Sequence, residues 1–470
     1  MTFSSLTFLW FFLPIVFLMY QVVPKKAKNI WLLGTSLLFY GWGEPKYIVL
    51  MIVSILLNYA SGLLIDRKKR SPLMMNKIIL AICILLNLLL LGYFKYFNLL
   101  IDSVNHLAGG EVLTFSRVLL PIGISFYTFQ ALSYVIDLYR NETQVQKNLI
   151  HFALYVTFFP QLIAGPIVKY HDIAKQLDER IADSDKIVLG IKRFIIGFAK
   201  KVILSNSFAA ISDQILELEY KNIGTILAWT AMILYSLHIY YDFSGYSDMA
   251  IGLGKMFGFD FLENFNFPYL ADSVKNFWTR WHISLSTWFK EYLYIPLGGN
   301  RKGHYRTYLN LLIVFFLTGL WHGASYTFVI WGLFHGFFLI VERVFLGKFL
   351  ERNNLKFLNH IYTLLVVIVG WVFFRIESLS GSLELLGQMF IPQRGMYNLT
   401  QFINAKSILL LLLGILFCGI FQKSFPKFYT KITDEKQNRL FVYAVLLVLF
   451  AIGTVFLVTN TYNPFIYYRF

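Results

Sequence analysis

The sequence predicts an all-α polytopic membrane protein. Of its 470 residues, 57% are hydrophobic and only 14% are charged, whereas soluble proteins carry about a quarter charged residues. Apolar segments long enough to cross a bilayer, about 20 residues each, recur along the whole chain. Because lipid offers the backbone no hydrogen-bond partners, such segments form helices or a closed barrel. Their length and continuous apolarity favour helices.

We expect about eleven or twelve spanning segments, several of them short or partly polar. The clearest candidates are Leu6–Val23, Tyr47–Ile65, Lys77–Ile101, Val118–Tyr139, Leu309–Phe328 and Phe441–Val458. The first has no basic stretch before it and no small-residue cleavage site after it, which indicates a retained helix rather than a signal peptide. No linker or change of composition divides the chain, so we expect a single membrane domain over residues 1–470 with a motif-rich core at about 118–340.

Basic residues, which give the chain a formal net charge of +16, gather at the ends of the apolar segments. Lys25 and Lys26 follow the first segment and Arg67–Arg70 follow a later one, whereas Asp102–Ser116 is nearly free of them. Positive residues in short loops mark the cytoplasmic side. We therefore expect Arg67–Arg70 inside the cell, and Asp102–Ser116 and the N-terminus outside. Charges in these places argue against a nucleic-acid ligand.

The segment Ile187–Leu204 differs from a simple span because it carries a basic stripe. Lys192, Arg193, Lys200 and Lys201 fall within about half a turn of a helical wheel, and the rest of the segment is apolar. Such a helix lies in the membrane interface more comfortably than it spans the bilayer. We expect an interfacial helix that lines the cytoplasmic entrance, with a basic stripe that attracts the phosphates of an acyl donor or anionic headgroups of membrane lipids.

Acidic residues interrupt the apolar segment Tyr235–Phe257. Asp242 and Asp248 frame a polar stretch that includes Ser244 and Tyr246. Carboxylates at membrane depth are costly and usually face a polar interior or a water-filled cavity. Two interpretations stay open: the acids line a substrate path, or they satisfy buried donors and take no part in chemistry.

The long interruption between residues 260 and 307 predicts a re-entrant helix. Asp272 or Ser273 is a plausible N-cap, and the helix would continue through Phe289. Its aromatic sides hold Phe277, Trp281 and Trp288, and next to them Trp278, His282 and Leu285. Its polar strip holds Arg280, Ser284 and Thr287. A helix of this kind is walled by protein rather than by lipid.

His282 and His322 are the histidines best suited to act as bases. His322 lies at the junction of two apolar stretches, where Gly319 and Gly323 can break the helix and leave room for a substrate. An imidazole in a dry cavity can take the proton of an attacking hydroxyl. The alternative is that His322 only marks a break between helices.

The remaining histidines are ordinary by default. His238 and His335 lie in strongly apolar helices, where a histidine is usually hydrogen-bonded to the core. The sequence contains no Walker-type phosphate loop, no nucleophile elbow and no Cys/His cluster with zinc spacing. We therefore expect no metal and no bound cofactor.

Several ordered motifs resemble those of the membrane-bound O-acyltransferases. They are Phe158–Ile167, Tyr241–Gly254, Glu263–Pro268, Phe277–Trp288, Tyr294–Asn300 and Trp321–Ala324. Within this family the chain is most similar to the alginate O-acetyltransferase branch, from Met1 to about Arg375. The resemblance implies a ring of helices around a central tunnel.

The resemblance also implies a function and a site. His322 would be catalytic and His282 would lie near the reaction path. The other residues that match motifs along this path are Asp242, Ser244, Tyr246, Asp248, Trp278, Arg280, Trp281, Ser284 and Trp321. The donor would be acetyl-CoA or another acyl thioester, used at a bacterial cytoplasmic (inner) membrane. An extracytoplasmic acetyltransferase or esterase-like partner and polysaccharide export machinery would complete the O-acetylation of an exported polysaccharide.

Two alternatives stay open. D-alanyl transfer to teichoic acid uses the same core motifs, although the length of this chain and its Gly370–Arg375 segment favour the alginate-type branch. A solute transporter is the other alternative, because Asp242 and Asp248 could bind an ion. The lack of internal repeats and the aromatic interruption at Phe277–Trp288 count against a transporter.

Overall fold

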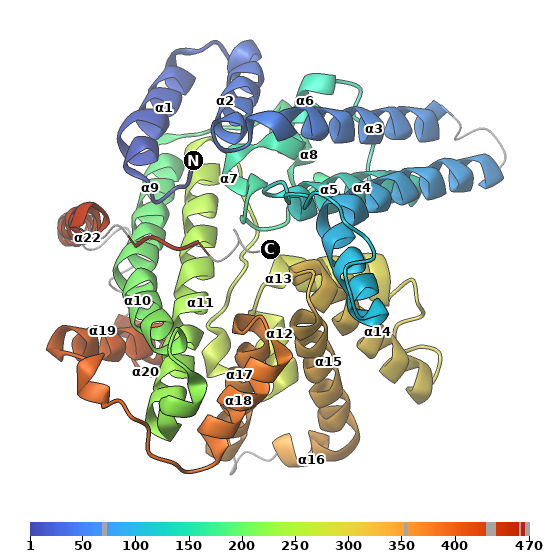
Figure 1. The fold of residues 1–470 in the computed structure, drawn as a ribbon. Coiled ribbons are helices and arrows are strands. Elements are labelled where there is room, and N and C mark those ends of the chain that lie inside the picture. The colour runs from blue at the N-terminus through green and yellow to red at the C-terminus, as the bar shows by residue number, and fades with distance from the viewer. Residues whose placement is uncertain (68–72, 352–355, 429–438, 460–461, 466–470) are drawn as a thin grey trace. The chain divides into compact units, whose positions relative to one another are not determined.

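The computed structural model describes residues 1–67, 73–351, 356–428, 439–459 and 462–465. Within these ranges every regular element is a helix, which confirms the all-α prediction (Figure 1). The chain forms two compact units, each made of two segments. Unit 1 comprises Met1–Phe194 and Met249–Leu262, and unit 2 comprises Ile195–Asp248 and Glu263–Phe470. The single domain expected from the sequence stays a prediction.

Unit 1 holds the N-terminal helices. In chain order they are η1 (Phe8–Phe12), α1 (Leu13–Val22), η2 (Lys25–Ala27), α2 (Lys28–Gly43), η3 (Pro45–Tyr47), α3 (Ile48–Arg67), α4 (Leu73–Ala108), α5 (Ile124–Tyr139), α6 (Leu149–Thr157), α7 (Phe159–Leu162), α8 (Tyr170–Asp178) and the first part of α9 (Ser184–Ala199). Helices α3 and α4 lie side by side (Figure 1). The distant segment at residues 249–262 belongs to this unit, and one of its contacts is the hydrogen bond that the Tyr20 hydroxyl donates to the Phe257 carbonyl over 2.9 Å.

Unit 2 holds the rest of the described chain. Its elements are η4 (Lys200–Ser205), α10 (Asn206–Leu216), η5 (Tyr220–Asn222), most of α11 (Gly224–Met256), η6 (Pro268–Leu270), α12 (Val274–Arg280), α13 (Ile283–Phe289), η7 (Lys290–Tyr294), α14 (His304–His322), α15 (Tyr326–Val341), η8 (Glu342–Leu346), α16 (Gly347–Leu350), α17 (Lys356–Arg375), α18 (Leu379–Phe390), η10 (Leu399–Gln401), α19 (Ala405–Ile415), η11 (Leu416–Ile420), α20 (Phe421–Ser424) and α22 (Arg439–Thr459). Helices α14 and α15 can pack closely because glycines lie where they meet. A Cβ on Gly319 would collide with the Phe328 carbonyl, and a Cβ on Gly332 would collide with the Phe315 carbonyl.

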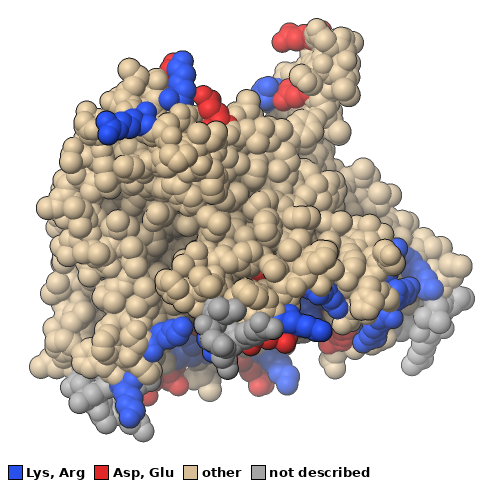
Figure 2. All heavy atoms as spheres, turned by 90° about the horizontal axis from the view of Figure 1, so that it is seen from below, with Lys and Arg blue, Asp and Glu red and all other residues tan. Residues whose placement is uncertain are grey.

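The polytopic prediction is confirmed. Among the described residues, six helical stretches are long and apolar enough to cross a membrane: Pro45–Arg67, Met74–Ala108, Tyr326–Leu350, Lys356–Arg375, Ala405–Ser424 and Leu440–Thr459. Phe8–Val22 is a shorter apolar helix. Figure 2 shows a face made mostly of uncharged residues, with Lys, Arg, Asp and Glu in small groups. The total of eleven or twelve spans, the ring and the tunnel stay predictions.

Two of the expected spans are interrupted. In the stretch expected at residues 118–139, α5 begins only at Ile124, because Gly123 has a left-handed backbone with φ 78°. In the stretch expected at residues 309–328, α14 ends at His322 and Gly323 is extended. The Ser325 side chain then caps α15. Lys68–Arg70, expected on the cytoplasmic side, lie outside the described residues.

The prediction of a basic stripe on one interfacial helix is wrong for Lys200 and Lys201, two of its four residues. The helix changes to a π-helical turn at η4, and such a turn shifts the register of the side chains. Lys201 is only 1% exposed, and its Nζ lies 2.6 Å from Oδ1 of Asp242. Lys200 Nζ lies 2.7 Å from Oδ2 of Asp248. Both lysines are therefore paired with acids of α11 rather than with donor phosphates or lipid headgroups.

Candidate active site

The segment expected to form one helix up to Phe289 is two short helices with His282 between them. The Ser273 hydroxyl accepts a hydrogen bond from the Asn276 amide over 3.0 Å, which confirms the expected N-cap of α12. Trp281 is extended, and His282 has a left-handed backbone (φ 45°, ψ 55°) before α13 begins. The continuous helix is therefore wrong. A non-glycine residue held in this conformation costs about 1–3 kcal/mol and is typical of functional sites.

Asn264, for which the sequence predicts no role of its own, holds this break in place. Its backbone carbonyl accepts a hydrogen bond from the Ile283 amide over 3.0 Å. Its side-chain oxygen lies 3.2 Å from the Ser284 amide nitrogen, 2.9 Å from Ser284 Oγ and 3.2 Å from Nδ1 of His282. The side chain is buried. The available signal was its place in the Glu263–Pro268 motif.

His322 is the last residue of α14. Its ring packs against those of Trp331 and Phe374, with centroids 5.0 and 5.4 Å away. The residue that follows must be small, because a Cβ on Gly323 would collide with the Phe328 ring. The end of this helix therefore places the imidazole inside the protein, among aromatic rings.

Unit 2 brings the two predicted histidines together. The ring centroids of His282 and His322 are 6.4 Å apart, and the two residues are 1% and 3% exposed. Phe243 of α11 lies 4.6 Å from the His282 ring, and Trp321 lies 6.0 Å from it. The result is a pair of buried groups that can accept protons in surroundings that exclude water. Within the described ranges, no three His, Cys, Asp or Glu side chains are grouped so as to bind a metal ion.

The predicted tryptophans line the surroundings of this pair. Trp278 packs on Trp331, with ring centroids 5.6 Å apart, and Trp331 in turn packs on His322. The ring centroid of Trp281 lies 5.0 Å from that of Trp371, and Trp371 in turn stacks on Trp331. Ser284 contacts Asn264 as described above. The structure thus gathers Trp278, Trp281, Ser284 and Trp321 around the histidines.

The other two buried histidines differ. His238 Nδ1 lies 2.9 Å from the Ser205 hydroxyl, as expected for a core histidine. His335 packs edge-on against Trp278 at 5.0 Å, and neither of its ring nitrogens has a hydrogen-bond partner in the part of the chain that the structure describes. The expectation that His335 is hydrogen-bonded to the core is therefore wrong.

The remaining predicted residues make other contacts. Arg280 donates hydrogen bonds to the Asn276 side chain and the Asn266 carbonyl, so it braces a loop. Asp242 and Asp248 form the ion pairs with the η4 lysines, which favours the interpretation that they satisfy buried donors. On the same helix Ser244 is buried, and the Tyr246 ring packs at a tilt against the ring of Phe465, with centroids 4.7 Å apart.

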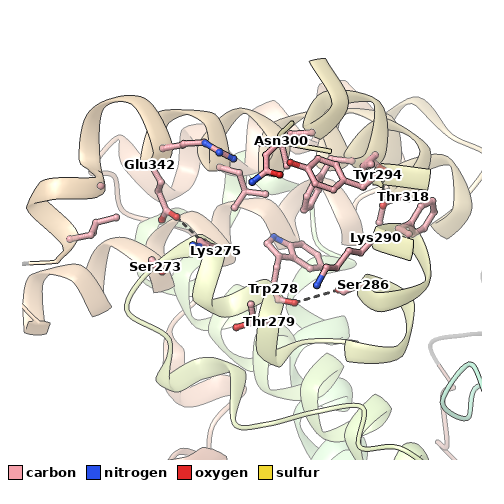
Figure 3. A pocket seen from close by; sticks show the side chains of 18 of the residues that line it. Ser273, Lys275, Trp278, Thr279, Ser286, Lys290, Tyr294, Asn300, Thr318 and Glu342 are labelled. Carbon is pink, nitrogen blue, oxygen red and sulfur yellow. Dashed lines mark hydrogen bonds between the residues drawn. The ribbon is translucent and has the colours of Figure 1, made fainter. Parts of the chain in front are cut away.

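A pocket of about 860 Å³ lies beside this cluster within unit 2. Its walls come mainly from α12, α13, η7, α14, the end of α15, η8 and α16. Figure 3 shows the Trp278 indole between Glu342 and Ser273 at one end of the pocket and Lys290 and Thr318 at the other. The charged residues that line it are Asp272, Lys275, Lys290, Glu342, Arg343 and Glu351. Trp278 also packs on Trp331, so two indole rings in contact connect the pocket wall to His322.

Comparison with known proteins decides the family. The sequence model of the membrane-bound O-acyltransferase family matches residues 140–385, which include Asn264, His282 and His322. The chain belongs to this family. It is 40% identical to the probable alginate O-acetylase AlgI of Pseudomonas putida over the full length of both chains.

Two further relatives of this acyltransferase differ in acceptor. The chain is 37% identical to the peptidoglycan O-acetyltransferase of Helicobacter pylori, over 82% of this chain and 79% of the relative. It is 29% identical to the teichoic acid D-alanyltransferase of Bacillus subtilis, over 54% of this chain and 66% of the relative. The alginate-type resemblance is thus confirmed, and the alanine-transferring enzymes are more distant.

Proposed function

We propose that this O-acyltransferase moves acetyl groups from a cytoplasmic thioester donor across a bacterial cytoplasmic membrane, for the O-acetylation of an exported polysaccharide. The support is twofold. The names of relatives at 40% and 37% identity specify O-acetylation, whereas the alanine-transferring relative matches only about half of the chain. The chain is also a multi-pass membrane protein, as transfer between two membrane faces requires.

The paired imidazoles are the observation that carries the proposal. His322 takes the proton of the acceptor hydroxyl while the hydroxyl oxygen bonds to the thioester carbonyl carbon. The bond from that carbon to sulfur then breaks, and the leaving thiolate takes the proton back from the imidazolium. A positioned base contributes about 10²–10⁴-fold to such a step. Burial of both rings keeps out water, which would otherwise hydrolyse the thioester.

The pocket is our candidate for the donor site. Its volume of about 860 Å³ suits a small-molecule ligand. Lys275, Lys290 and Arg343 in its walls can pair with phosphate groups such as those of acetyl-CoA. Trp278 closes the side of the pocket that leads to the histidines, so the acyl end of a donor would point toward them. No resident cofactor is needed for this chemistry.

Partners follow from the proposed direction of transfer. An acetyl group delivered to the outer face needs an acceptor there, which we assign to an extracytoplasmic acetyltransferase or esterase-like protein. Polysaccharide export machinery would supply the polymer, and membrane lipids would surround the apolar helices.

A deletion strain tests the proposal. Ester-linked acetate and D-alanine are measured after mild alkaline release from exported polysaccharide, peptidoglycan and teichoic acid. Loss of acetate from a carbohydrate fraction, restored by the wild-type gene, is the expected result, and the affected fraction identifies the acceptor. Loss of D-alanine esters instead would establish the alternative, and unchanged esters in all three fractions would refute acyl transfer to the cell envelope.

A further inference from the structure

The orientation of the Asn264 side-chain amide is determined by a backbone group. The Ser284 amide nitrogen lies 3.2 Å from Asn264 Oδ1. A backbone N–H can only donate a hydrogen bond, so the atom that faces it must be the side-chain oxygen. A flipped Asn264 would set its NH₂ group against another donor. The Ser284 hydroxyl, 2.9 Å from the same oxygen, can also donate to it.

This orientation determines which nitrogen of His282 carries the proton. Nδ1 of His282 lies 3.2 Å from Asn264 Oδ1, and a carbonyl-type oxygen has only lone pairs to offer. In the neutral ring, Nδ1 must therefore hold the hydrogen, and Nε2 holds the lone pair. Nε2 is buried and has no hydrogen-bond partner among the described residues. Because buried polar atoms are normally paired, a buried acceptor of this kind points to a donor supplied by a ligand.

The backbone of His282 depends on the same residue. The Ile283 amide donates to the Asn264 carbonyl over 3.0 Å, and α13 starts with no cap from the side chain of His282 itself. Asn264 therefore caps α13 in its place, through the Ser284 amide. One asparagine thus holds both the left-handed turn and the ring orientation. Ring contacts of His282 in the described residues are with Phe243, Trp321 and His322, so the titratable neighbour among them is His322.

We infer that Asn264 is a positioning residue that keeps His282 in the Nδ1–H tautomer, so that Nε2 accepts a hydrogen bond from a non-reacting N–H or O–H group of a bound substrate. The role of His282 Nε2 as a substrate contact rests on the proposed acyl transfer, whereas the assignment of the Nδ1–H tautomer is independent of it. Acyl donor and acceptor both carry such groups, and the substrate whose KM rises when Asn264 is replaced identifies the one that is bound.

The tautomer is tested by ¹⁵N NMR of histidine-labelled protein in lipid nanodiscs, with the His282 signals assigned by their absence in His282→Gln. The wild type should show Nδ1 protonated and Nε2 unprotonated at neutral pH. Asn264→Ala should lose this preference. Asn264→Asp should keep Nδ1–H and should stabilise the doubly protonated ring, so that deprotonation needs a pH about 1–3 units higher. Asn266→Ala, an exposed asparagine of the same loop, is the matched control and should match the wild type.

Acetyl transfer by the same proteoliposome preparations is the second readout. Asn264→Ala should lower kcat/KM about 10–100-fold, as loss of an orienting partner does elsewhere. Asn264→Asp should regain activity at alkaline pH, with the acidic limb of its pH profile shifted upward. Protonation of Nε2 in the neutral wild-type ring would overturn the inference, and so would an Asn264→Asp profile that is unshifted. Correct NMR signals without acetyl transfer in the wild type would instead refute the proposed function.

Discussion

Replacing Lys201 with methionine removes the cation of a buried ion pair. Lys201 is 1% exposed and Asp242 is 0% exposed, and 2.6 Å separates Lys201 Nζ from Oδ1 of Asp242. The ammonium also donates to Oδ1 of Asn206 over 2.8 Å. Without it, the Asp242 carboxylate stays buried and loses the ammonium that is paired with it. Breaking a buried pair in this way costs about 3–5 kcal/mol of unfolding free energy.

The assay is thermal unfolding of the purified protein in one detergent, followed by tryptophan fluorescence. Lys200→Met is the matched control on the same π-helical turn. Its pair with Asp248 is partly open to water, since the Lys200 side chain is 26% exposed, and exposed pairs contribute only about 0–1 kcal/mol. The melting temperature of Lys201→Met should therefore lie well below that of Lys200→Met. The double variant Lys201→Met/Asp242→Leu should recover much of the loss, because replacing both partners is often nearly neutral. Equal melting of both single variants would refute the burial argument.

Three other predictions concern packing, capping and topology. Gly370→Ala should lower the free energy of unfolding by about 1–3 kcal/mol, because the new Cβ would lie 2.6 Å from Nε2 of His335. Gly387→Ala is the control, since a Cβ there would meet open space. Equal melting temperatures of the two variants would contradict the close packing at Gly370. Glu342→Leu should lower the free energy of unfolding by about 1–3 kcal/mol, because the two carboxylate oxygens accept hydrogen bonds from the Val274 and Lys275 amides over 2.6 and 3.0 Å. Glu342→Gln keeps one acceptor oxygen and should be destabilised less. A lower melting temperature for Glu342→Gln than for Glu342→Leu would count against this cap. A cysteine that replaces Glu111 should react with a membrane-impermeant thiol reagent added to intact cells, and a cysteine that replaces Arg67 should not. The native Cys83 and Cys418 are buried, so we expect little labelling of them. The reverse labelling pattern would invert the topology.

Much of the fold follows from composition, because each apolar segment must satisfy its own backbone. The helices predicted at residues 77–101 and 441–458 lie within α4 and α22, and the one predicted at residues 47–65 lies in α3 except for Tyr47. Periodicity failed where the backbone departs from a regular helix. The π-helical turn at η4 moved Lys201 from the expected surface stripe to Asp242, and no helical wheel can show such a shift of register.

The candidate site was predictable in its two histidines but not in what holds them. His282 and His322 could be singled out by chemistry and by motif, and the structure places their rings 6.4 Å apart. Apart from its place in the Glu263–Pro268 motif, nothing in the sequence marks Asn264, because its contact with His282 depends on a left-handed backbone that the aromatic run around His282 does not suggest. A helix break of this kind is set by a partner 18 residues away in the chain. Such a long-range contact leaves no local pattern.

Single-turnover acetyl transfer in proteoliposomes tests whether His322 is the base that takes the proton of the acceptor hydroxyl. Purified wild type and His322→Gln are each mixed with a labelled acetyl thioester and an acceptor, after matched elution and melting show that both are folded. Glutamine keeps the size and hydrogen bonding of the side chain but cannot take up the proton. We expect His322→Gln to transfer acetyl about 10²–10⁴-fold more slowly than the wild type. Transfer by a folded His322→Gln protein at close to the wild-type rate would show that His322 is not the base.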